Sequence, residues 1–179
     1  GKKTISIGSC VRWAGGSIDT KNNILYITSD NIADIITIEK DVGNLNYYHE
    51  WDTFQDNNGY PAIKPPWGSI TAMNLNSGKI IWTRPFGTIK ELEKENIFNT
   101  GSTNRAGLTA TSGDIIFASG TEDKMFRVFD SNNGEELWSY QMDSAGSAPP
   151  TIFEFEKKQF ILVPAYEKEG NKVYAFTLD

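Results

Sequence analysis

Several polar and aromatic side chains lie beside short apolar runs, in positions suited to binding a flat or anionic ligand. Asp30 and Asn31 directly follow the apolar run Ile24–Ser29. Arg105 precedes another such run, and a guanidinium pairs bidentately with carboxylates. Trp67 lies between two prolines and a glycine, a stiff setting that can present an indole to a flat ring or a sugar. These residue types favour ligand recognition.

Each of these residues also has a purely structural interpretation. Asp30 and Asn31 can form an Asx turn that caps the end of a strand. Arg105 can be a surface residue bonded to a neighbouring loop, and Trp67 can be a packing plug between adjacent units, which is the interpretation we favour for it. Lys64 is a weaker candidate partner for a carboxylate.

The sequence excludes several other kinds of site. One cysteine, Cys10, rules out an internal disulfide and a cysteine-based metal cluster, and one histidine, His49, rules out a multi-histidine zinc site. No Gly-x-Gly-x-x-Gly or Gly-Lys-Ser/Thr motif is present. The net charge of -6 argues against a nucleic-acid partner, because phosphates require a basic surface.

Three segments of the chain resemble one another, and they predict the elements that position the candidate residues. The segments begin at Ser17, Leu108 and Ile152, and each is a short strand, a polar turn and a run of β-branched or aromatic residues. A run too short for a helix is typical of a strand buried on both faces.

A second pattern follows the first two copies. Ala72–Trp82 and Val128–Trp138 share an Asn or Asp, a Gly and a closing Trp at the same spacing. The Asx and Gly residues suit a tight hairpin. We therefore interpret Trp82 and Trp138 as structural residues of an outer strand, each wedged between adjacent units.

The repeats predict an all-β fold, a β-propeller fragment with about three four-stranded antiparallel blades. The predicted first blade covers residues 12–86 with a long insertion at 30–68, the second covers 105–142 and the third covers 147–179. The third blade lacks its outer strand, as expected where another part of a ring supplies it. The alternative is a β-sandwich with coincidental repetition.

The longer predicted loops gather on one face of such a propeller. They are 30–68, 87–106, 143–148 and 165–171, and a face of long loops on a rigid scaffold commonly carries the binding site. A short amphipathic helix is expected at 89–96. Asp123, in a short loop, is interpreted as a turn-forming residue, and His49 as a loop-packing residue.

With these motifs placed, the whole chain resembles the last blades of pyrroloquinoline-quinone (PQQ)-dependent sugar dehydrogenases. Ala72-Met-Asn-Leu-Asn-Ser-Gly-Lys-Ile-Ile-Trp82 is similar to the tryptophan-docking motif of quinoprotein alcohol and glucose dehydrogenases. Pro65-Pro-Trp-Gly68 is similar to a segment of the glucose-dehydrogenase branch. Gly113–Asp130 and Val173–Leu178 resemble that branch's last two blades in order.

The resemblance implies an eight-bladed ring that binds PQQ and Ca²⁺ near its axis. Such an enzyme passes hydride from a sugar, polyol or alcohol to the quinone and electrons to ubiquinone or cytochrome c. The catalytic aspartate and the metal ligands come from earlier blades, so this chain alone should be inactive. The expected location is the periplasm, with any membrane association provided by a region N-terminal to this chain.

The resemblance also implies roles for five residues in cofactor binding. Relatives place an asparagine against the quinone in the segment of Asp30 and Asn31, although a carboxylate there is unfavourable beside a tricarboxylate unless a cation intervenes. Arg105 stands where relatives often carry an aromatic or apolar residue, and would pair with a quinone carboxylate. Trp67 would lie beside the ring. Relatives often carry a histidine in the last-blade loop, and this chain has none there. Either Tyr166 takes over its role, or this member has lost glucose specificity or cofactor binding altogether.

A non-catalytic propeller of the same repeats, acting as a scaffold for protein partners, is the alternative. In either case the expected partners of this chain are the remaining blades or further copies of itself, because an open stack exposes apolar faces and strand edges.

Overall fold

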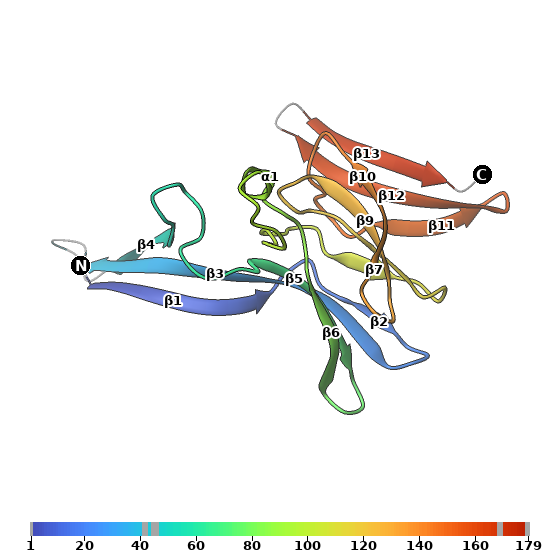
Figure 1. The fold of residues 1–179 in the computed structure, drawn as a ribbon, viewed down its shortest axis with the longest axis horizontal. Helices are drawn as coiled ribbons and strands as arrows, with labels where there is room; N and C mark the ends of the chain where they lie inside the picture. Colours follow the sequence, from blue (N-terminus) through green and yellow to red (C-terminus); the bar gives the residue numbers. More distant parts are fainter. Residues whose placement is uncertain (1, 41–42, 44–46, 168–169, 178–179) are drawn as a thin grey trace.

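The computed structural model describes residues 2–40, 43, 47–167 and 170–177 and contains three antiparallel sheets (Figure 1). The first blade consists of β2 (Ser17–Asp19), β3 (Ile24–Lys40), β5 (Gly68–Asn74) and β6 (Lys79–Pro85). The second consists of β7 (Leu108–Ala110), β8 (Ile115–Ala118), β9 (Met125–Asp130) and β10 (Glu136–Gln141). The third has three strands, β11 (Thr151–Phe155), β12 (Lys158–Glu167) and β13 (Gly170–Thr177). This arrangement confirms the predicted fold class.

The strand registers show that the three sheets are copies of one unit. Tyr26 pairs with Ser17 on one side and Ala72 on the other. In the second blade Phe117 pairs in the same way with Thr109 and Val128. In the third, Leu162 pairs with Thr151 and Ala175. The repeat seen in the sequence is therefore a structural repeat.

The innermost strands of adjacent blades approach one another, as expected around a propeller axis. β2 contacts β7, and Ser17 Oγ accepts a hydrogen bond from Ala110 N at 3.0 Å. Thr109 Oγ1 donates to Pro150 O at 2.6 Å, immediately before β11. Segments that enter the inner strands therefore lie at the axial side of the stack.

The core lies between the blades. Tyr26, Ile70 and Trp82 of the first blade pack against Leu108 and Ile116 of the second. A second cluster joins the second and third blades and contains Phe117, Phe126, Val128, Met142, Ile161 and Val163. Successive residues of β8 thus point into different cores, and this strand is buried on both faces as predicted. From Tyr26 to Asp30 of β3 and from Ile161 to Ala165 of β12 only alternate residues are buried, because the described structure covers one face of each of those sheets.

The predicted loop at 30–68 is wrong over much of its length. β3 continues to Lys40 and pairs with β1 (Lys2–Val11) on one side and β4 (Tyr47–Thr53) on the other. These three segments form an arm that extends to one side of the first blade (Figure 1). Asp30 and Asn31 have side chains that are common in turns, but the β-branched residues Ile35–Ile38 follow them in the chain and favour the continuation of the strand.

Two smaller expectations also change. The helix predicted at 89–96 is shortened to α1 (Lys90–Glu93), which buries Leu92. The predicted loop at 165–171 is largely strand, since β12 reaches Glu167 and β13 begins at Gly170. Within the described ranges, no helix has the length and apolar character needed to cross a membrane.

Both docking tryptophans contact the following blade. The Trp82 indole N–H donates to Ser131 O at 2.9 Å, and the ring covers Gly134. Trp138 lies edge-on to Phe176 with ring centroids 5.9 Å apart. Trp82 is 7% exposed and Trp138 is 47% exposed, so the first contact is the more completely formed within the described residues.

We expect Gly134→Ala to destabilise the chain more than Gly78→Ala. Both glycines occupy the same turn position in their repeats, with φ of +71° and +67°. A Cβ at Gly134 would lie 2.6 Å from the Trp82 ring, whereas a Cβ at Gly78 meets nothing within 4 Å. The backbone conformation alone costs roughly 1 kcal/mol at either site, and the clash adds about 1–3 kcal/mol at Gly134. Urea unfolding measures both, and equal losses would refute the docking contact.

Candidate functional site

Segments from two blades meet at the axial ends of the strands and form the candidate site. Arg12, which follows β1, donates its backbone N–H to Thr28 O at 3.1 Å. Asn104 forms a bridge with Thr121, and Arg105 N donates to Gly120 O at 3.1 Å. The turns that enter β2 and β7 are thereby fixed to Thr28, within β3, and to Gly120 and Thr121, just after β8, in the region where the sequence predicts the site.

Three pockets lie beside these segments, and neighbouring pockets share lining residues. The inner pocket has a volume of about 320 Å³ and lies between the arm and residues 103–105; its lining includes Cys10, Arg12, Asp30, Asp34, Trp51 and Arg105. The middle pocket, of about 410 Å³, includes Tyr60, Trp67, Ser102 and Glu122. Ile32, Thr103 and Arg105 line both.

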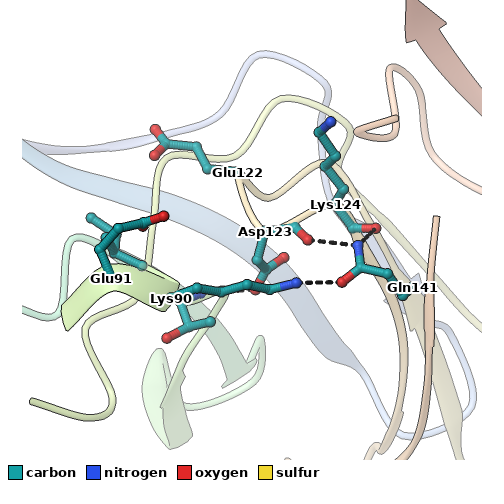
Figure 2. Close-up of a pocket in the computed structure, with 8 residues that line it drawn as sticks. Lys90, Glu91, Glu122, Asp123, Lys124 and Gln141 are labelled. Carbon is teal, nitrogen blue, oxygen red and sulfur yellow. Dashed lines mark hydrogen bonds between the residues drawn. The ribbon is translucent and has the colours of Figure 1, made fainter. Parts of the chain in front are cut away.

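The outer pocket, of about 380 Å³, continues from the middle pocket, with which it shares Ile89, Glu91 and Glu122. In Figure 2 the Lys90 ammonium points across it to Gln141, with which it forms a hydrogen bond. The Gln141 amide in turn donates to Asp123 O at 2.9 Å. Since the Lys90 ammonium and the Gln141 amide are paired with one another, they are less available to a ligand in this pocket.

Arg105 lies where the inner and middle pockets meet. Its side chain is exposed at the border of the inner and middle pockets, and its backbone is fixed. Among the described residues its guanidinium has no hydrogen bond or ion pair. Both interpretations of Arg105, as a ligand-binding residue and as a surface residue, therefore stay predictions.

Asp30 is almost completely buried, with 2% of its surface exposed. Its Oδ1 accepts hydrogen bonds from Asn104 N at 3.1 Å and from Asn104 Nδ2 at 2.6 Å. Its Oδ2 lies 3.2 Å from Arg12 Nη1. Burial raises the pKa of the Asp30 carboxyl to about 6, although the charge of Arg12 and the hydrogen bond from Asn104 lower it.

Arg12 and Asn104 are site residues that sequence reasoning missed. Arg12 supplies the cation that a carboxylate at position 30 requires beside an anionic ligand. Both residues stand five positions before an equivalent inner-strand residue, Ser17 and Thr109. Aligning the residues before each repeat would have revealed their shared position, but not their contact across the blades.

Asn31 and Trp67 are brought together. Asn31 N donates to Trp67 O at 2.9 Å, and the Asn31 amide donates to Pro66 O at 3.4 Å. Trp67 is 5% exposed, and its indole N–H donates to Ile63 O at 2.8 Å. Trp67 is therefore chiefly a packed residue that also lines the middle pocket. Lys64, which is exposed, lines none of the three pockets.

Tyr166 lies apart from these residues. It is on β12 of the third blade, 65% exposed, and its backbone N–H donates to Ala145 O at 3.2 Å. It lines none of the three pockets. The described structure therefore does not join Tyr166 to Arg105, and its role in cofactor binding stays a prediction.

Asp123 does more than form a turn. Its Oδ1 accepts from Met125 N at 3.0 Å, while both carboxylate oxygens accept from the Arg127 guanidinium. Arg127 Nε also donates to Glu136 Oε2 at 3.0 Å. Burial by itself raises the pKa of Asp123, but its hydrogen bonds and the charge of Arg127 outweigh burial and hold that pKa below its usual value. The network also holds the segment that follows β6, because the backbone N–H of Thr88 donates to Asp123 Oδ2 at 2.9 Å.

The described residues contain no group of three or more His, Cys, Asp or Glu side chains able to hold a metal ion. Around the inner and middle pockets the described part of the chain thus places one exposed arginine, Arg105, and the aromatic side chains of Trp51, Tyr60 and Trp67.

Comparisons with known proteins show the family to which the chain is related. Residues 4–161 match the family described as PQQ, the glucose/ethanol/alcohol dehydrogenase β-propeller domain. The chain is 30% identical to quinoprotein glucose dehydrogenase of Escherichia coli over 131 residues, which cover 67% of this chain and 16% of that protein. It is also 30% identical to quinate/shikimate dehydrogenase (quinone) of Acinetobacter baylyi over 68% of this chain and 16% of that protein.

A solved structure shows the same fold. Quinohemoprotein alcohol dehydrogenase from Comamonas testosteroni superimposes with a TM-score of 0.67 at 14% identity, covering 96% of this chain and 28% of that one. The chain thus spans about a sixth of the length of the curated relatives it matches.

We expect Arg127→Met to destabilise the chain by about 3–5 kcal/mol, because it leaves the buried Asp123 carboxylate without its partner. The double variant Asp123→Asn/Arg127→Met should recover a large part of that loss, since the buried charge is removed. Chemical denaturation at pH 7 measures both. A double variant no more stable than Arg127→Met would contradict the pairing.

The pH dependence of stability should report on Asp30. Between about pH 4 and pH 6 the folded chain holds a proton on Asp30 that the unfolded chain releases, so the free energy of unfolding contributed by this group falls as pH rises through that window. The change is about 3 kcal/mol at most. Asp30→Asn should flatten the profile there, as measured by urea titrations at half-unit pH steps. A parallel profile in the variant would show that Asp30 does not titrate in this range.

Proposed function

This chain belongs to the PQQ β-propeller family of glucose, ethanol and alcohol dehydrogenases, and on that premise we propose that it is the C-terminal part of a PQQ-dependent dehydrogenase. Its substrate in this proposal is a sugar, polyol or alcohol. The observation that carries the proposal is Arg105, whose backbone is fixed at the border of two pockets and whose guanidinium has no hydrogen bond or ion pair among the described residues.

The residues present fit a planar tricarboxylate cofactor. Arg105 can pair with one of its carboxylates. Asp30 does not oppose this, because Arg12 lies 3.2 Å from its carboxylate and offsets its charge. Asn31 and Trp67 are fixed together beside the middle pocket and would define one wall of the site. When bound, the quinone supplies the capacity to accept a hydride, and these side chains bind and orient it.

Other parts of the parent protein complete the proposal. The catalytic aspartate and the Ca²⁺ ligands would come from other blades. Electrons would leave to ubiquinone or cytochrome c, and the protein would act in the periplasm. This chain by itself would be inactive.

The test uses the full-length protein that contains this chain. With PQQ, Ca²⁺ and a dye acceptor, we expect quinone-dependent dye reduction on at least one aldose, polyol or alcohol. Arg105→Met should weaken PQQ binding at least tenfold, because it removes a charge-assisted pair worth about 1.5–3 kcal/mol, whereas Lys64→Met, which removes a cation outside the pockets, should not.

Absence of dye reduction across panels of aldoses, polyols and primary alcohols would defeat the dehydrogenase proposal. That outcome would favour the alternative, a propeller that acts as a protein-interaction scaffold. Equal PQQ affinity in the Arg105→Met variant and the unmodified protein would remove Arg105 from the site.

A further inference from the structure

Asn104, the residue directly before Arg105, is held by the first blade through both its backbone and its side chain. Its N–H and its Nδ2 donate to Asp30 Oδ1 at 3.1 Å and 2.6 Å. Its carbonyl oxygen accepts from Arg12 Nε at 2.7 Å. All three bonds join segments at least 74 residues apart in the chain, so they fix the second blade's entry turn to the first blade.

Arg12 and Asp30 also pair with each other, with Nη1 3.2 Å from Oδ2. We call Arg12, Asp30 and Asn104 the clamp. Asp30 is 2% exposed, so its carboxylate is committed to the interior of the clamp and has little surface to offer a ligand. Immediately after the clamp, the Arg105 N–H is bonded to Gly120 O, and the Arg105 side chain emerges at the pockets.

We propose that Asp30 is a positioning residue: together with Arg12 it holds Asn104, and thereby directs the Arg105 guanidinium to the border of the inner and middle pockets. The inference rests on the proposed function, because it assumes that Arg105 binds a carboxylate of the cofactor. It assigns Asp30 a role through Arg105 in place of direct contact with the ligand.

A positioning role of Asp30 can be distinguished from a purely electrostatic effect of its negative charge on an anionic ligand. The charged groups around Asp30 are Arg12, Arg105 and Glu122, and Asp34 lines the same inner pocket. If Asp30 acted only through its charge, neutralising it would strengthen the binding of an anion. If Asp30 positions Arg105, neutralising it releases the clamp and weakens that binding.

The experiment titrates the full-length protein with PQQ in the presence of Ca²⁺ at pH 7.5 and follows the quenching of protein fluorescence. Asp30→Asn should weaken PQQ binding about tenfold, the loss expected when one charge-assisted contact is misplaced. Asp34→Asn is the matched control: it makes the same charge change in the same pocket outside the clamp, and should give equal or tighter binding. Circular dichroism confirms folding, and Arg12→Gln serves as a second clamp variant with the same expected loss.

Two further readouts separate positioning from a general structural effect. The trimethyl ester of PQQ carries no charge for Arg105, so Asp30→Asn should change its affinity by less than about twofold. In addition, Asp30→Asn should add little to Arg105→Met in the double variant, because both changes remove the same contact.

Tighter PQQ binding by Asp30→Asn, an equal loss for the acid and its ester, or additive losses in the double variant would each overturn the positioning role while leaving the proposed function intact. Failure of the unmodified full-length protein to bind PQQ would instead overturn the proposed function, and this inference with it.

Discussion

The structure depends on one constraint: each blade is a sheet with an apolar face that only another blade can cover. β8 illustrates the constraint, because Ile116 and Ala118 enter the core shared with the first blade while Phe117 enters the core shared with the third. The Trp82 indole adds a directional contact at the outer edge of the first seam, through Ser131 O and the surface of Gly134. Burial of apolar area supplies the main driving force, and the indole fixes the angle at which the blades meet.

The same packing creates the candidate site. Because inner strands converge at the axis, the turn that enters one blade lies against its neighbour, where β3 passes from the first blade into the arm. Asp30 and Asn104 meet there although 74 residues separate them in the chain. A buried carboxylate is costly unless it is paired and hydrogen-bonded. Arg12 and Asn104 meet that requirement, and the cluster they form fixes the backbone beside Arg105.

The short coverage of the relatives is consistent with this architecture. The chain covers about a sixth of quinoprotein glucose dehydrogenase of Escherichia coli. The contacts between two neighbouring blades need only those two blades, so a chain of this length can contain them in full. A site near a ring's axis, however, draws side chains from many blades. The described residues accordingly provide one cationic wall of the proposed site and no acidic metal cluster.

The sequence by itself determined the blade pattern, because strand alternation, Asx-Gly turns and the two tryptophans are local signals that recur at matching positions. It also indicated Arg105 as a candidate, because a guanidinium just before an inner strand can pair with a carboxylate. It did not show the arm: Asp30 and Asn31 look like turn formers, and only pairing with β1 and β4 carries β3 on to Lys40. Nor did it show that Asp30 pairs with Arg12 and Asn104, or that Asp123 pairs with Arg127. Those contacts depend on strand register and blade packing, which bring together residues whose individual types give no sign of their partner.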